Sequence, residues 1–132
     1  MILVDTSVWI DFVRGRETDA VARLRLALDR GVVAALTPFI YQEVLQGADS
    51  ERSFRQLREF FGSQAFLNPR DPVDSHAEAA RLYFECRRKG VTVRSAVDCL
   101  VAQIAIEHGV ALLHDDRDFD GLARVATKLN FC

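Results

Sequence analysis

Short apolar runs alternate with longer amphipathic segments along this chain. The runs are too short for helices and are typical of buried strands. They lie at residues 2–4, 32–36, 65–67 and 110–113. Between them apolar residues recur at helical spacing, so the pattern predicts helices in these segments. The helices are expected from about Ser7 until Gly15 and over about 19–30, 38–46, 50–61, 73–89, 95–108 and 118–125, before a last extended stretch at 128–131.

The alternation of strands and helices predicts the fold class. It favours an α/β fold in which helices cover both faces of a central parallel sheet, giving a three-layer α/β/α arrangement. The 132 residues are 49% hydrophobic and 27% charged, which is ordinary globular composition. We therefore expect a single domain over residues 1–132. In such a sheet the carboxyl ends of the strands share an edge, which is where ligand crevices form.

Apolar faces assign particular side chains to the core. Trp9 and Phe12 recur at helical spacing beside valines, which favours core or dimer contacts over stacking on nucleic-acid bases. The helix over 73–89 is expected to pack through a face that carries small and large apolar residues. Its predicted packing residues are Ala77, Ala80, Leu82 and Phe84.

Charge and cysteine content narrow the function classes. The formal net charge is -2, and the basic side chains are nearly all arginines, because Lys89 and Lys128 are the only two lysines. No window is apolar for the length of a membrane span, and the N-terminus lacks the features of a signal peptide. The three cysteines and three histidines match no zinc-binding spacing. We expect oxygen-ligand chemistry and a cytoplasmic location.

Acidic residues follow two of the predicted strands and enter two of the predicted helices. Asp5 and Asp116 come after buried strands, and Glu43 lies one to two turns into the helix that follows the second strand. Asp98 lies in the first turn of the most apolar helix. In a doubly wound sheet these positions converge at the carboxyl edge. The sequence thus predicts an acidic pocket for a divalent metal.

Each of these acids also has a simpler explanation. Asp5 is placed to cap the following helix, and Glu43 sits on an amphipathic helix where glutamates are usually solvated. Asp98 gains about 0.3–1 kcal/mol from the helix dipole in its first turn. That gain does not explain a carboxylate in a segment apolar nearly all round, where an unpaired charge is costly. Asp98 is therefore the strongest indication of a functional role.

The loop after the last strand offers several acids close together. Asp116 is the preferred ligand, Asp115 is expected to point to solvent, and Asp118 is either a second ligand or the cap of the short helix beside it. Arg94 precedes Asp98 by four residues. It is placed either to meet an RNA phosphate beside the metal or to form a salt bridge with a site carboxylate.

Several carboxylates held within a few ångströms repel one another and need a counter-charge. Mg²⁺ and Mn²⁺ prefer oxygen ligands, and Mg²⁺ commonly completes its shell with substrate phosphates. The chemistry this favours is phosphodiester hydrolysis, in which the metal activates water and neutralises charge at phosphorus. Thr6 and Ser7 are placed either to orient these groups or to cap the helix.

The chain resembles the PIN-domain family, and within it the VapC-type ribonuclease toxins of bacterial toxin–antitoxin systems. The resemblance rests on ILVDTSVWI at 2–10, on Glu43, on TVRSAVDCLVA at 92–102 and on LLHDDRDF at 112–119. It implies a Mg²⁺- or Mn²⁺-dependent endoribonuclease. By matching motif positions it implies that Asp5, Glu43, Asp98 and Asp116 bind the metal, with Asp118 as an additional ligand.

The resemblance also implies partners. Toxins of this kind are usually homodimers, and a small cognate VapB-type antitoxin inhibits them by placing its tail in the acidic groove. Their substrates are structured RNAs, commonly transfer RNA. The near-neutral charge predicts weak non-specific RNA binding, so that shape recognition contributes to substrate choice.

Two other readings stay open at this point. The first is a metal-dependent phosphatase or phosphotransferase of another doubly wound fold. Enzymes that resemble haloacid dehalogenases use a second aspartate two residues after the first, whereas this chain has Ser7 there. The second is a non-catalytic PIN-like binding module, which would show neither Mn²⁺ affinity nor RNA turnover.

Overall fold

The fold is built on a four-stranded parallel sheet with the strand order β3-β2-β1-β4. The computed structural model describes residues 1–132. Its strands are β1 (Ile2–Val4), β2 (Ala34–Leu36), β3 (Ala65–Phe66) and β4 (Ala111–Leu113). In the register Leu3 lies opposite Ala35 on one side and Leu112 on the other. The carboxyl ends of β1, β2 and β4 therefore lie side by side.

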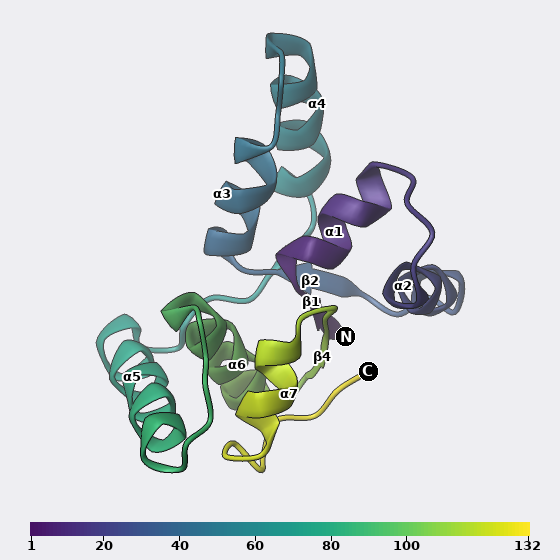
Figure 1. The fold of residues 1–132 in the computed structure, drawn as a ribbon. Coiled ribbons are helices and arrows are strands. Elements are labelled where there is room, and N and C mark those ends of the chain that lie inside the picture. The colour runs from purple at the N-terminus through teal and green to yellow at the C-terminus, as the bar shows by residue number, and fades with distance from the viewer.

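Seven helices surround the sheet (Figure 1). They are α1 (Thr6–Val13), α2 (Asp19–Asp29), α3 (Pro38–Gln46), α4 (Glu51–Gly62), α5 (Pro72–Arg88), α6 (Ala96–His108) and α7 (Arg117–Ala123). Helices α3 and α4 project together at one end of the molecule, and α5 packs along α6 at another (Figure 1). This is the predicted α/β fold with a central parallel sheet. None of the helices combines the length and the apolarity that crossing a bilayer requires.

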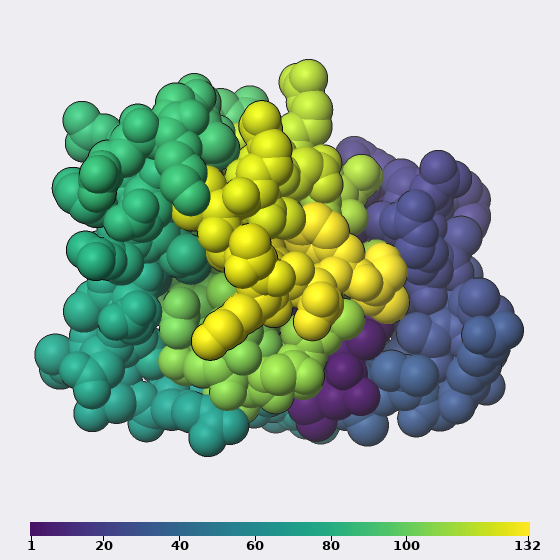
Figure 2. Space-filling model, turned by 90° about the horizontal axis from the view of Figure 1, so that it is seen from below, coloured from purple at the N-terminus to yellow at the C-terminus, as the bar shows by residue number.

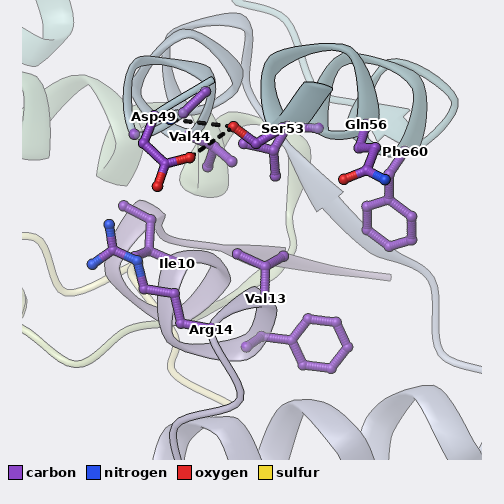
Figure 3. A pocket seen from close by; sticks show the side chains of 12 residues that line it. Ile10, Val13, Arg14, Val44, Asp49, Ser53, Gln56 and Phe60 are labelled. Carbon is purple, nitrogen blue, oxygen red and sulfur yellow. Dashed lines mark hydrogen bonds between the residues drawn. The ribbon is translucent and has the colours of Figure 1, made fainter. Parts of the chain in front are cut away.

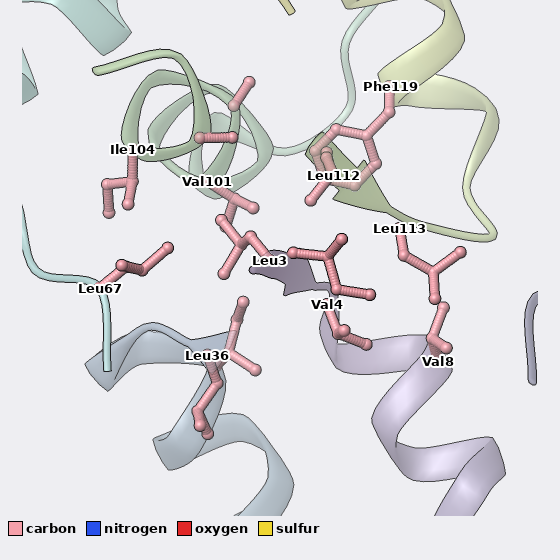
Figure 4. Packing of buried hydrophobic residues seen from close by; sticks show 14 of the residues in the cluster. Leu3, Val4, Val8, Leu36, Leu67, Val101, Ile104, Leu112, Leu113 and Phe119 are labelled. Atoms are coloured by element: carbon pink, nitrogen blue, oxygen red, sulfur yellow. The ribbon is translucent and has the colours of Figure 1, made fainter. Parts of the chain in front are cut away.

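The core lies on both faces of β1. Leu3 and Val4 are fully buried, with side chains of α6 such as Val101 on one side and Val8 of α1 on the other (Figure 4). Fully burying an aliphatic side chain of this size contributes roughly 1.5–3 kcal/mol. Burial on both faces explains why this strand reads as a continuous apolar run rather than an alternating one.

Helix ends follow the signals in the sequence. Thr37 Oγ1 accepts a hydrogen bond from the Ile40 amide at 3.1 Å, and Pro38 occupies the first helical position of α3. At the C-terminal end of α6, Gly109 adopts a left-handed conformation with φ of 64°. Side chains rarely tolerate that conformation, which is why glycine ends this helix.

The predicted packing face of α5 is wrong at three positions. Ala77 and Ala80 are exposed, and Phe84 is 50% exposed. The buried residues of this helix are Ser75, Ala79 and Cys86. Because α5 lies at the edge of the molecule and packs mainly along α6, it buries a narrow stripe. Alanines on several faces did not reveal which stripe that would be.

The second strand is shorter than the predicted run over 32–36. It begins at Ala34, so Val32 and Val33 lie in the segment before it.

The end of the predicted extended stretch runs beside β4 as far as Phe131, whereas Lys128, where the stretch was expected to begin, lies in a turn. The Leu112 amide donates to the Asn130 carbonyl at 2.8 Å, and the Cys132 amide donates to the Leu112 carbonyl at 3.0 Å. Seen from below, this yellow segment lies across the molecule between the teal α5 side and the blue α2 side (Figure 2). It thereby covers the outer edge of β4.

Candidate active site

One open hollow at the carboxyl edge of the sheet contains all five of the acids singled out in the sequence. Asp5 follows β1, Glu43 comes from α3 and Asp98 comes from the first turn of α6. Asp116 immediately precedes α7, and Asp118 lies in the first turn of that helix. The fold thus brings together acids from four separate parts of the chain. The other residues of the lining are Thr6, Ser7, Ile10, Arg94 and Ser95.

The tightest group is Asp98, Asp116 and Asp118. One carboxylate oxygen from each of these residues lies within 4.8 Å of the other two. Like charges at such separations disfavour simultaneous ionisation. The arrangement therefore requires protons or cations near the carboxylates.

Asp5 is 8% exposed and lines the same hollow as this group. Burial raises its pKa to about 6, and the charges of Glu43 and Asp116 add to the rise. Ser7 Oγ lies 3.5 Å from Asp5 Oδ2, a long hydrogen bond that acts weakly in the opposite direction. Asp5 occupies the N-cap position of α1, but its side chain makes no capping hydrogen bond. The capping explanation for this side chain is therefore wrong.

Asp98 has the more strongly perturbed carboxyl group. Partial burial raises its pKa to about 7, and the charges of Asp5 and Asp116 contribute further. Of the residues of α6, Ala96 alone is exposed, so the predicted buried character of this helix is confirmed. The helix dipole favours a negative charge in this first turn. Burial and like charges outweigh it here.

Glu43 is held in place by a neighbour rather than left in solvent. Thr6 Oγ1 donates a hydrogen bond to Glu43 Oε1 at 2.7 Å. The bond joins the first turn of α1 to the middle of α3 and leaves Glu43 half-buried. Sequence reasoning placed Thr6 near the site, but did not identify Glu43 as its partner.

Arg94 forms the salt bridge that the sequence allowed. Its Nε donates to Asp118 Oδ1 at 3.2 Å, and its backbone amide donates to Asp118 Oδ2 at 2.9 Å. Arg94 Nη2 also lies 3.4 Å from Asp116 Oδ1. Both oxygens of the buried Asp118 side chain thus have partners. The nearby carboxylates raise the pKa of Arg94 further, so it stays charged.

The cap of α7 is Asp116 rather than Asp118. Asp116 Oδ1 accepts a hydrogen bond from the Asp118 amide at 2.9 Å, and Asp116 has extended backbone angles at the N-cap position. The alternative in which Asp118 caps this helix is therefore wrong. The contacts of Asp116 with Arg94 and with the Asp118 amide both involve Oδ1, and Oδ2 makes no hydrogen bond or salt bridge.

His114 supports the Asp116 backbone, and sequence reasoning missed this contact. The Asp116 amide donates to His114 Nδ1 at 3.1 Å. The imidazole lies between the rings of Phe119 and Phe131, at centroid distances of 5.1 and 4.5 Å. Burial lowers the pKa of His114, which favours the neutral ring that can accept this bond. In the sequence, the only indication of this contact was that Phe119 and Phe131 follow His114 and could pack against its ring.

Trp9 belongs to the core and is 1% exposed. Its ring packs edge-on against Phe61 at a centroid distance of 5.2 Å and against Phe12 at 6.0 Å. The prediction of a core role is confirmed for Trp9. It cannot stack on a nucleic-acid base without unfolding this packing.

The donor set of the hollow fits a hard divalent cation. Its side chains offer carboxylate and hydroxyl oxygens and neither sulfur nor imidazole nitrogen. Burial and the neighbouring carboxylates raise the pKa values of Asp5 and Asp98, so their ionised forms are disfavoured in this hollow. A divalent cation would supply the positive charge that favours those ionised forms.

The family model of the PIN domain matches residues 2–125. This chain belongs to the PIN-domain family. It is 38% identical to the VapC ribonuclease of Mycobacterium bovis and to ribonuclease VapC11 of Mycobacterium tuberculosis, over 95% of this chain and 93% of each relative. The predicted resemblance to VapC proteins is therefore confirmed.

Solved PIN-fold structures share the architecture at lower identity. A toxin–antitoxin complex from Klebsiella pneumoniae matches 92% of both chains with a TM-score of 0.71 and 21% identity. VapBC2 from Rickettsia felis, bound to a promoter DNA fragment, matches 100% of this chain and 98% of its own with a TM-score of 0.72 and 16% identity. At these identities the likeness establishes the fold of this chain.

Proposed function

We propose that this PIN-domain protein is a Mg²⁺- or Mn²⁺-dependent endoribonuclease and the toxin of a VapBC-type toxin–antitoxin pair. Its 38% identity to proteins named as VapC ribonucleases supports the reaction class. The observation that carries the proposal for this chain is the group of Asp98, Asp116 and Asp118 oxygens within 4.8 Å, with Asp5 buried beside them. Scaffold proteins have no need of carboxylates in so unfavourable an arrangement.

Asp5, Asp98 and Asp116 are the side chains that would hold the cation, with Glu43 completing the set. Asp116 would bind the cation through Oδ2, because Oδ1 already accepts a hydrogen bond from the Asp118 amide. A bound Mg²⁺ or Mn²⁺ supplies positive charge at the scissile phosphate and activates a water for attack. Thr6 orients Glu43, and Arg94 with Asp118 orients Asp116. Asp118 serves as a further ligand only if its bonds to Arg94 open.

The proposed partners are an RNA substrate, for which transfer RNA is the first candidate, and a small antitoxin protein. A structural neighbour described as a toxin–antitoxin complex and another described as VapBC2 support the antitoxin. We also propose a homodimer in the cytoplasm. An apolar hollow between α5 and α6, lined by Ala79, Tyr83, Val97 and Leu100, supports a second copy as partner. Light scattering coupled to size-exclusion chromatography measures that oligomeric state.

The decisive experiment is cleavage of total cellular RNA by the purified protein with Mn²⁺, with Mg²⁺ or with EDTA. The parent is compared with Asp98→Asn and with Asp74→Asn, which removes the exposed acid at the same place in the first turn of α5. We expect discrete fragments from the parent and from Asp74→Asn in the presence of metal. We expect none with EDTA and none from a folded Asp98→Asn.

The same experiment separates the remaining alternatives. Cleavage by Asp98→Asn at the parent rate would assign Asp98 a structural role and contradict the proposed site. Metal binding by calorimetry without cleavage of any RNA, including purified transfer RNA, would instead support a binding module. Sequencing of the fragment ends identifies the substrate and the cleavage site.

A further inference from the structure

Helix α4 carries three arginines on one outward face. Arg52, Arg55 and Arg58 follow one another at intervals of three residues, all three are exposed, and they line a shallow hollow together with Gln56 and Glu59. Residues three apart are neighbours on a helix surface. The three guanidinium groups therefore form a continuous cationic surface, which we call the α4 arginine face.

These arginines have no carboxylate partner. The salt bridges of the chain, with N···O distances up to 4.0 Å, involve Arg16, Arg25, Arg81, Arg94 and His114 but none of the three. Glu59 lines the same hollow without pairing with any of them. In a chain of net charge -2, this is a local excess of unpaired positive charge. Such a surface attracts polyanions.

A second hollow, drawn in Figure 3, shares one lining residue with this face and another with the acidic site. It lies between α1 and the α3–α4 pair, and its lining includes Ile10, Arg14, Gln56 and Phe60. Ile10 also lines the acidic hollow, and Gln56 also lines the hollow of the α4 arginine face. The three hollows therefore adjoin one another along the surface. Phe60 is 46% exposed here, and Arg14 has no salt-bridge partner.

The acidic site cannot by itself attract a polyanionic substrate. Five carboxylates line it, and Arg94, its one lining arginine, is already engaged by Asp116 and Asp118. Positive charge that holds RNA must therefore come from outside this hollow. Arginine binds phosphate in a bidentate manner, and an exposed aromatic ring beside it offers a base a surface for stacking.

We propose that the α4 arginine face binds the phosphate backbone of the single-stranded RNA segment that leaves the acidic site, with Phe60 and Arg14 along the path. This inference rests on the proposed ribonuclease function. An acidic protein segment has the same charge complementarity. RNA is favoured because the face adjoins, through the second hollow, the site where RNA phosphates must bind.

The test compares two triple variants with the same loss of charge. In the first, Arg52, Arg55 and Arg58 are each changed to Gln. In the matched control, Arg81, Arg87 and Arg88 of the distant helix α5, all of them exposed, are changed to Gln. Affinity for a fluorescein-labelled single-stranded RNA of about 20 nucleotides, long enough to span such a path, is measured by anisotropy in EDTA. Binding in EDTA requires no catalysis, so this readout is independent of turnover.

We expect the α4 variant to bind this RNA about 10- to 100-fold more weakly than the parent at about 100 mM salt. Its slope of log affinity against log salt should be smaller by about 2, because each lost phosphate contact on a single strand removes about 0.7. The α5 control should bind within about twofold of the parent, since it removes no phosphate contact. Equal losses in both variants, or none in either, would overturn the proposal.

Turnover provides a second readout. With Mn²⁺, the α4 variant should show a raised KM and an unchanged kcat on long RNA. A trinucleotide too short to reach α4 should be cleaved at the parent rate. If the parent cleaves no RNA at all, the ribonuclease function fails, while the binding comparison still decides the role of the face. A variant that binds RNA normally but loses affinity for an acidic peptide would contradict the RNA assignment and favour a protein partner.

Discussion

Thr6 donates its hydroxyl hydrogen to Glu43 Oε1 at 2.7 Å, and this bond ties α1 to α3 beside the acidic site. The two residues are 37 positions apart in the chain. The hydroxyl fixes the glutamate at a separation where it adds to the electrostatic field on Asp5. Thr6 is therefore a positioning residue for one of the proposed metal ligands.

Thr6→Val keeps the shape of the side chain and removes this hydrogen bond. We expect a loss of about 1 kcal/mol in the free energy of unfolding, because Glu43 loses a neutral donor at a half-buried site. Mn²⁺ affinity measured by calorimetry should fall several-fold, since Glu43 must then be ordered on binding. Thr6→Ser retains the hydroxyl and should bind Mn²⁺ nearly as the parent does. Equal affinity in the valine variant would show that Glu43 needs no positioning.

Without metal, stability should decrease as the pH rises from about 4 to about 7. The pKa of Asp98 is raised from 3.8 to about 7 and that of Asp5 from 3.8 to about 6. Between these values the folded protein binds more protons than the unfolded chain, so raising the pH favours unfolding. We expect a loss on the order of 2 kcal/mol across this window in EDTA, well below the full linkage value because solvent screens the partly exposed Asp98 carboxyl group. Urea unfolding at a series of pH values measures this loss.

Two comparisons decide whether these carboxylates cause the slope. Asp98→Asn should make the slope shallower, leaving the part that Asp5 contributes, and should unfold at higher urea than the parent near the upper end of the window. Asp74→Asn should keep the parent slope. Saturating Mn²⁺ should stabilise the parent by about 2.7 kcal/mol at 100-fold excess over its Kd. It should stabilise Asp98→Asn much less. A parent whose stability in EDTA rises steadily through the window would contradict the raised pKa values.

Asp118→Asn tests whether this residue binds metal or positions Asp116. The amide retains one acceptor for the Arg94 backbone but loses the ion pair at 3.2 Å. We expect a lower melting temperature and a Mn²⁺ affinity reduced several-fold, less than for Asp98→Asn or Asp116→Asn. Asp115→Asn makes the same change at the exposed neighbouring position and should alter neither quantity. Complete loss of Mn²⁺ binding in a folded Asp118→Asn would assign the residue as a ligand.

The sequence predicted the fold and the gathering of the acids well, because both depend on local pattern. A short apolar run marks a strand, and a parallel sheet places the residues after β1 and β4 at one edge whatever the details of packing. Asp5 and Asp116 were therefore placed by their position alone. Glu43 followed from its place one to two turns into α3, and Asp98 followed from its place in the first turn of α6.

What the sequence could not predict was which polar groups pair with which. Arg94 and Asp118 are 24 positions apart, and their contact depends on how the loop before α6 packs against α7. Whether Asp116 or Asp118 caps α7 depends on which of the two residues precedes the first helical turn. The two positions differ by two residues, which is no more than the uncertainty of a helix boundary. The stripe of α5 was misassigned for a related reason, since its alanines are compatible with burial and with exposure.

Phe131 links the end of the chain to the acidic site through His114, and its removal should therefore affect more than stability. Phe131→Ala deletes the ring that lies 4.5 Å from the imidazole, and His114 holds the Asp116 amide. We expect a loss of about 1–2 kcal/mol, because Phe131 is 39% exposed and only part of its ring is buried. We also expect kcat for RNA cleavage to fall several-fold at a temperature where the variant is fully folded. Phe84→Ala, at a phenylalanine that is 50% exposed on α5, should keep the parent kcat. If Phe131→Ala loses stability but keeps the parent kcat and Mn²⁺ affinity, His114 does not position Asp116 through this contact.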